Sequence, residues 1–96
     1  MPAYIIAQIN VRDAEKYQEY AKRAGPAAAK YGGRYLVRGG AKHPLEGEIP
    51  FSRIVVAEFK DVESAKRYYH SPEYQEARSH RVGAADFNMV IVEGAA

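Results

Sequence analysis

Two tandem units of strand, helix and strand organise this sequence, and that order constrains its fold more than any other feature. Right-handed crossovers place both helical regions on one face of a four-stranded antiparallel sheet. The sequence therefore predicts an α+β, ferredoxin-like βαββαβ fold, and its length of 96 residues suits a single domain over residues 1–96 with one core. β-Branched, apolar runs predict the strands at Tyr4–Val11, Arg34–Arg38, Ile54–Phe59 and Phe87–Val92.

Capping residues mark where the helices are expected to begin. Asp13 is typical of the N-cap of a first amphipathic helix, and Asp61 of a second helix that ends near His70. Ser71-Pro72 then favours a helical restart, because serine caps a helix and proline suits its first position.

Glycine and proline mark where regular structure is expected to break. Gly25-Pro26 is expected to interrupt the first helix, leaving one further turn at Ala27–Lys30. Prolines and a glycine among charges make Ala41–Ser52 a loop or an irregular hairpin connection. The segment Glu93–Ala96 is expected to be a frayed tail.

Residues two apart along a strand share one side of a sheet, so parity predicts what each side carries. The even positions hold six Ile, Leu or Val residues, which is too much exposed apolar surface for a side that faces water. A second copy laid sheet to sheet would bury this side, so we expect a homodimer. The odd positions are expected to pack under the helices: Ile5, Ala7, Ile9, Val11, Tyr35, Val37, Val55, Ala57, Phe59, Phe87, Met89 and Ile91.

The even side also carries polar residues, which need partners, water or a ligand when they are buried. Glu58 is expected to meet an arginine of the second strand: Arg34 if the connection is symmetric, Arg38 if it is lopsided. Such a pair could anchor a ligand, or it could be an ion pair that fixes the register of a dimer. The candidate ligand-binding residues are Arg34, Arg38, Glu58, Asn10, Asn88, Tyr69 and His43, the last on the long loop.

Several classes of function are excluded by what the sequence lacks. There is no cysteine, and the three histidines have no metal-ligand spacing, so neither a metal nor another cofactor is expected. The net charge is only +2 and the basic residues form no stripe, and the even side of the third strand has no aromatic residues on which bases could stack. We therefore expect that the protein does not bind nucleic acid. No stretch is long and apolar enough to span a membrane, and we expect a cytoplasmic protein.

Four motifs carry a resemblance to a known family: Gly32-Gly33-Arg34-Tyr35-Leu36-Val37-Arg38-Gly39-Gly40, Glu46-Gly47, Glu58-Phe59 and Ser71-Pro72-Glu73-Tyr74-Gln75. With them, nearly the whole chain resembles the domain of unknown function 1330 family, within the dimeric α/β-barrel superfamily. The resemblance implies a barrel built from the sheets of two copies. It implies no activity, because the wider superfamily includes cofactor-independent monooxygenases, haem-degrading enzymes, other enzymes and ligand-sensing domains.

Two hypotheses for function follow from these observations. In the first, the homodimer binds a small organic molecule in a cavity between sheet and helices, and two arginines against one carboxylate favour an anionic ligand. Whether such binding also supports a cofactor-free reaction stays open. In the second, the protein is a noncatalytic dimeric structural or ligand-sensing module, whose polar residues satisfy one another.

Overall fold

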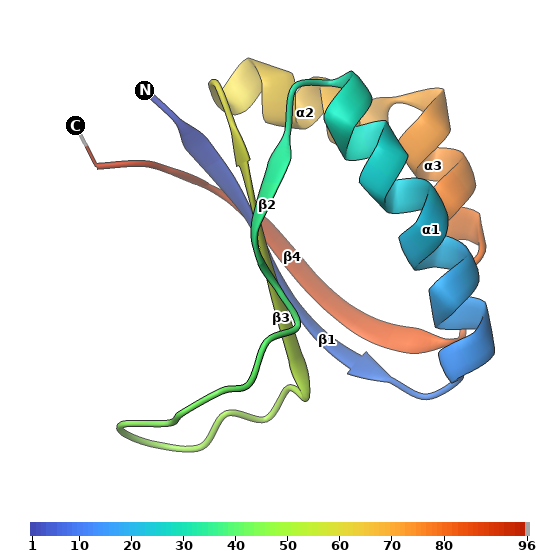
Figure 1. Cartoon of the computed structure of the whole chain (residues 1–96), viewed down its shortest axis with the longest axis vertical. Coiled ribbons are helices and arrows are strands. Elements are labelled where there is room, and N and C mark those ends of the chain that lie inside the picture. Colours follow the sequence, from blue (N-terminus) through green and yellow to red (C-terminus); the bar gives the residue numbers. More distant parts are fainter. Residues whose placement is uncertain (96) are drawn as a thin grey trace.

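Four antiparallel strands form one sheet with the order β2-β3-β1-β4, which confirms the predicted ferredoxin-like topology. The computed structural model describes residues 1–95 of the chain. All three helices lie on one side of this sheet (Figure 1). The elements are β1 Ala3–Val11, α1 Ala14–Lys30, β2 Arg34–Arg38, β3 Arg53–Phe59, α2 Val62–His70, α3 Pro72–Ser79 and β4 Ala85–Glu93.

The core between helices and sheet is built from aromatic rings and alanines. The small alanine side chains let the helices approach the sheet, and the rings fill the remaining space. The Tyr20 and Tyr74 hydroxyls lie 3.0 Å apart, so these two buried polar groups satisfy each other. The buried core residues are Ile5, Ala7, Ile9, Tyr17, Tyr20, Ala24, Ala27, Ala28, Ala57, Phe59, Ala65, Tyr68, Tyr74 and Ala77.

Helix α1 is continuous, so the expected interruption at Gly25-Pro26 was wrong. Proline removes one backbone hydrogen bond from a helix, and burial of the neighbouring alanines offsets that loss. Ala24, Ala27 and Ala28 are all buried, which holds both halves of α1 on the core.

The expected frayed tail was also wrong in part. Glu93 is the last residue of β4, and the backbone N–H of Gly94 donates to the Pro2 carbonyl at 2.8 Å. This bond continues the pairing of β4 with the start of β1. Ala96 lies outside the described residues.

A β-bulge in β2 changes which side chains share a face. Tyr35 pairs with Ala57, but the next paired residue is Val37, opposite Val56, and Leu36 is the extra residue. One inserted residue reverses the parity of everything after it. Val37 therefore lies on the side away from the helices and is exposed, whereas Arg38, opposite Val55, lies on the helix side. Both placements are the reverse of the parity prediction.

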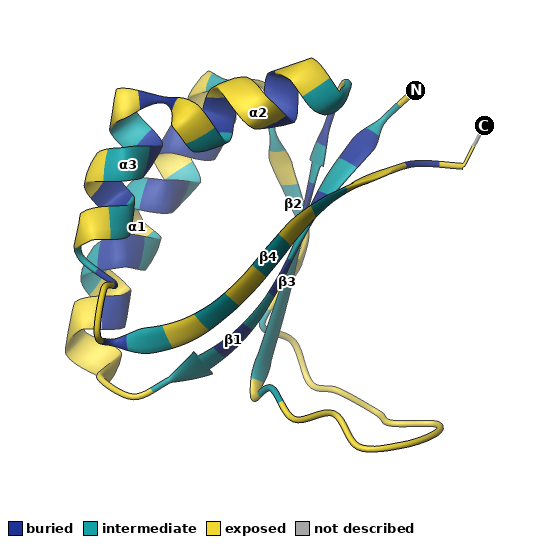
Figure 2. Cartoon of the chain, turned by 180° about the vertical axis from the view of Figure 1, so that it is seen from behind, coloured by how far each residue is buried: buried dark blue, intermediate teal, exposed yellow. Residues whose placement is uncertain are grey.

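The side of the sheet away from the helices is hereafter called the open face. Its centre is Val56, which lies between Ile6 of β1 and Val37 of β2. Apolar residues are exposed across it, and β4 shows the alternation of exposed and half-buried residues clearly (Figure 2). The most exposed of these apolar residues are Leu36, Val37, Val90 and Val92. Within the described residues, no helix has the length and apolar character needed to cross a membrane.

Ser71 caps α3, as predicted, and its replacement gives a first test of the fold. The buried Ser71 hydroxyl accepts from the Tyr74 backbone N–H at 3.0 Å and donates to the Tyr68 carbonyl at 2.7 Å. Ser71→Ala is expected to lower the free energy of unfolding by about 0.5–2 kcal/mol, measured by urea denaturation. Ser79→Ala is the control, because that hydroxyl is exposed. Equal midpoints for wild type and Ser71→Ala would show that the cap contributes nothing.

Candidate functional site

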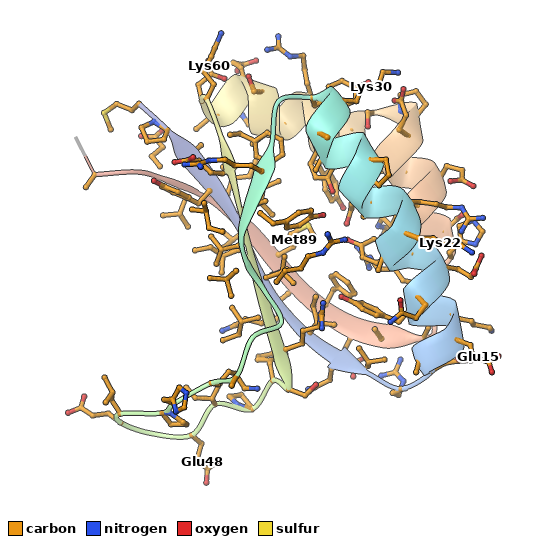
Figure 3. The ribbon with its side chains drawn as sticks, in the orientation of Figure 1. Glu15, Lys22, Lys30, Glu48, Lys60 and Met89 are labelled. Atoms are coloured by element: carbon orange, nitrogen blue, oxygen red, sulfur yellow. The ribbon has the colours of Figure 1, made fainter. Side chains whose placement is uncertain are left out.

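A small cavity lies between α1 and the helix side of the sheet, and two arginines line it. Its volume is about 30 Å³, room for little more than ordered water, so a larger ligand must displace side chains. Met89 points into this space from β4 (Figure 3). The lining is otherwise mostly aromatic and aliphatic: Ile5, Ala7, Ile9, Tyr17, Tyr20, Ala21, Ala24, Tyr35, Val55, Ala57, Tyr68 and Phe87, with Arg38 and Arg53. We call it the arginine cavity.

Arg38 reaches the cavity because the β-bulge turns it toward α1. Its guanidinium lies 4.3 Å from the centre of the Tyr35 ring, and its Nη2 lies 3.5 Å from the Ala21 carbonyl of α1. Gly25 leaves room for this approach, since a Cβ at that position would lie 3.1 Å from Nη2. Arg38 is exposed, so it can move without disturbing the core.

Arg53, the first residue of β3, enters the cavity beside Arg38. Its guanidinium lies 5.4 Å from the Tyr17 ring centre, and its Nη2 lies 3.5 Å from the Arg38 carbonyl. Glycine is required at position 39 for two reasons. Its φ of +73° is a conformation that other residues rarely adopt, and a Cβ would lie 2.2 Å from the Arg53 guanidinium. The Nε of Arg53 is buried without a hydrogen-bond partner among the described residues.

The electrostatics of the arginine cavity favour an anion. Among the described residues that line it none is acidic, and neither arginine forms a salt bridge with any part of the chain that the structure describes. Burial raises the pKa of Tyr35, and burial raises the pKa of Tyr20 and Tyr68 strongly. These phenols therefore stay protonated at neutral pH. In this form they cannot act as general bases, and the hydroxyls of Tyr20 and Tyr68 already have partners in the core.

Glu58 lies on the open face, in a separate polar cluster. The Arg34 Nε donates to its Oε1 at 2.7 Å, and the Tyr4 hydroxyl donates to its Oε2 at 3.3 Å. Both neighbours are direct cross-strand partners of Glu58. Of the two pairings that the sequence left open, the structure shows the one with Arg34. The other, with Arg38, is excluded by the β-bulge.

The remaining candidate residues are dispersed. Asn10 holds the long loop, since its Nδ2 donates to the Pro50 carbonyl and its Oδ1 accepts from the Ser52 N–H. His43 is exposed on that loop. Asn88 lies opposite Gln8 on the open face. Tyr69 borders a different cleft, beside α2 and β4.

Arg53 was not predicted as a site residue, because the third strand was expected to begin one residue later, at Ile54. The signal was present in the parity: residue 53 continues the odd positions Val55 and Ala57, which face the helices. Within residues 1–95, no group of three His, Asp or Glu side chains is placed to hold a metal ion.

Comparison with known proteins supports the fold and confirms the family resemblance that the sequence motifs indicated. Residues 2–95 match the family model described as "Domain of unknown function (DUF1330)". No curated protein matches. Among solved structures, a protein of unknown function from Rhodopseudomonas palustris is 23% identical with a TM-score of 0.79, and the match covers 99% of this chain and 83% of that one.

Two more distant structures share the architecture. A dimeric ferredoxin-like protein of unknown function from Jannaschia is 12% identical, with a TM-score of 0.69 and coverage of 98% of this chain and 100% of that one. A cofactor-independent oxygenase from Streptomyces nogalater is also 12% identical, with a TM-score of 0.64 and coverage of 99% and 94%. At these identities the likeness shows the fold alone.

Proposed function

The chain belongs to the family described as Domain of unknown function (DUF1330), and on that premise we propose that it is a homodimer that binds a small anionic organic molecule in the arginine cavity. One observation carries the proposal: Arg38 and Arg53 enter an aromatic cavity whose described lining holds no carboxylate. Guanidinium groups recognise carboxylates by paired, charge-assisted hydrogen bonds. The apolar lining suits the rest of such a ligand.

The homodimer is proposed from the open face. Exposed Leu36, Val37, Val90 and Val92 leave apolar surface that a second copy would cover. A structural neighbour from Jannaschia is described as dimeric, which agrees with this proposal. In the dimer the Arg34–Glu58 pair would lie at the interface, where it would fix the register of the two copies.

We also propose that the arginine cavity supports a reaction on the bound molecule. Two guanidiniums and the protonated phenol of Tyr35 could stabilise negative charge that develops on a bound molecule. One neighbour is described as a cofactor-independent oxygenase, which agrees with a reaction of this kind. The proposal of binding does not depend on it.

A structural role for the two arginines is the second candidate. Arg38 contacts the Ala21 carbonyl of α1 and Arg53 contacts the Arg38 carbonyl, so both could connect elements without any ligand. In that case the protein would be a dimeric module with no small-molecule site. The two candidates differ in their response to anions.

Matched pairs of carboxylate and amide separate these candidates. Benzoate and phenylacetate are expected to raise the melting temperature, whereas benzamide and phenylacetamide, which lack the charge, are not. At ten times its Kd a ligand adds about 1.4 kcal/mol to the free energy of unfolding, which corresponds to several degrees for a domain of this size. Equal shifts from acid and amide, or none from either, would favour the structural role.

A further inference from the structure

The loop between β2 and β3, residues 39–52, forms an arm with a fixed base. Asn10 clamps its C-terminal end through the Pro50 carbonyl at 3.1 Å and the Ser52 N–H at 2.8 Å, and the Ser52 hydroxyl donates to the Ile9 carbonyl at 3.2 Å. At the other end the Gly39 N–H donates to the Ile54 carbonyl at 2.9 Å. Both ends of the arm are therefore held against the sheet.

The tip of the arm has little contact with its own chain. Leu45 is 97% exposed and Ile49 is 42% exposed, so two large apolar side chains of the arm face solvent. Residues 40–50 are exposed throughout (Figure 2). Isolated apolar side chains on a surface are ordinary, but a leucine on a projecting, anchored arm has no packing role within this chain.

The arm projects on the same side of the sheet as the open face. The arm extends away from the helices, on the side of the sheet that they leave uncovered (Figure 1). Glu48 points outward from it, away from the body of the chain (Figure 3). A second copy that covered the open face would therefore meet the arm at its edge.

The open face alone is too small for a stable dimer interface, so the arm is needed to enlarge the buried area. The four strands have 9, 5, 7 and 9 residues, which at about 3.3 Å per residue and about 4.8 Å between strands gives roughly 480 Å². A stable interface buries about 800 Å² per partner, so the sheet alone falls short. Two arms, one from each copy, would supply the difference, because a two-fold axis uses every contact twice.

We propose that the arm of each copy lies against the second copy of the chain, with Leu45 as its apolar anchor. This inference depends on the proposed homodimer and adds the segment that holds it. Lys42 donates to the Ser52 carbonyl at the base of the arm, so Glu46 and Glu48 give the tip a negative charge. A negative tip suits a copy of net charge +2 better than a nucleic acid or an anionic membrane.

Two variants test the arm in the full chain. Leu45→Asp is expected to raise the dimer Kd roughly tenfold or more, measured by sedimentation equilibrium. Val82→Asp is the matched control, because Val82 is an exposed valine (64%) in the turn after α3, off the open face, and its Kd should be unchanged.

Crosslinking gives a readout that does not depend on affinity. The chain has no cysteine, so Leu45→Cys carries a unique thiol for a benzophenone maleimide. Irradiation is expected to give a covalent dimer, whereas Ser79→Cys on α3 should not. A monomeric wild type would overturn the proposed dimer and the arm together. A dimeric wild type with unchanged Leu45→Asp affinity and no crosslink would overturn the arm alone.

Discussion

Val56→Glu is expected to convert the protein from a dimer of about twice 10.7 kDa to a monomer of 10.7 kDa. Val56 lies at the centre of the open face, between Ile6 and Val37. In the proposed dimer a carboxylate there would be buried without a partner, which costs about 3–5 kcal/mol. The cost arises in both copies, so the dimer Kd should rise by about four orders of magnitude or more.

The measurement is light scattering at micromolar concentration, with circular dichroism to show that the monomer stays folded. Ser79→Glu, an exposed position on α3, is the control for added charge and should remain dimeric. The proposed interface would be wrong if Val56→Glu stayed a dimer, since no face-to-face packing of the sheets could tolerate two central carboxylates. A wild type of 10.7 kDa would remove the dimer itself.

Replacing both cavity arginines is expected to abolish binding of benzoate. A hydrogen bond to a charged group contributes about 1.5–3 kcal/mol, so Arg38→Gln and Arg53→Gln should each weaken binding by about 10- to 100-fold. The double variant should show no binding that calorimetry can detect. Arg67→Gln is the matched control, because Arg67 is exposed on α2 and does not line the cavity.

The two single variants should differ in stability. Arg38 is exposed, so its replacement should change the melting temperature little. Arg53 is half-buried against Tyr17, and its loss also removes packing. Unchanged benzoate affinity in the double variant would place the ligand elsewhere. A loss of affinity in Arg34→Gln instead would move the site to the open face, where Arg34 pairs with Glu58.

Parity predicted which face most strand residues occupy and failed at one bulge, which reversed the placement of Val37 and Arg38. Alternation along β1 placed Ile5, Ala7 and Ile9 under the helices, and all three are buried. The same rule placed Arg38 with Glu58, on the wrong face, because Leu36 is an inserted residue. A bulge of this kind depends on how the strand pairs with its neighbour, so a count along one strand cannot locate it.

The candidate site was only partly accessible from the sequence. The Arg34–Glu58 pair followed from register, whereas the role of Asn10 in holding the arm did not, because it depends on contacts with a loop forty residues away. Arg53 was missed at a strand boundary, where assignments from sequence are least certain. The arginine cavity depends on both features, because the bulge turns Arg38 into it and the earlier start of β3 places Arg53 in it.

An NMR titration with benzoate tests most directly whether an anion binds in the arginine cavity. The Nε–H group of each arginine gives its own signal and so reports on its own site. Binding in the arginine cavity predicts that the Nε–H signals of Arg38 and Arg53 shift and saturate together, with the Met89 methyl group beside them. The Arg67 signal should stay in place. Shifts centred on Arg34, or no saturable shift at Arg38 and Arg53, would contradict the account.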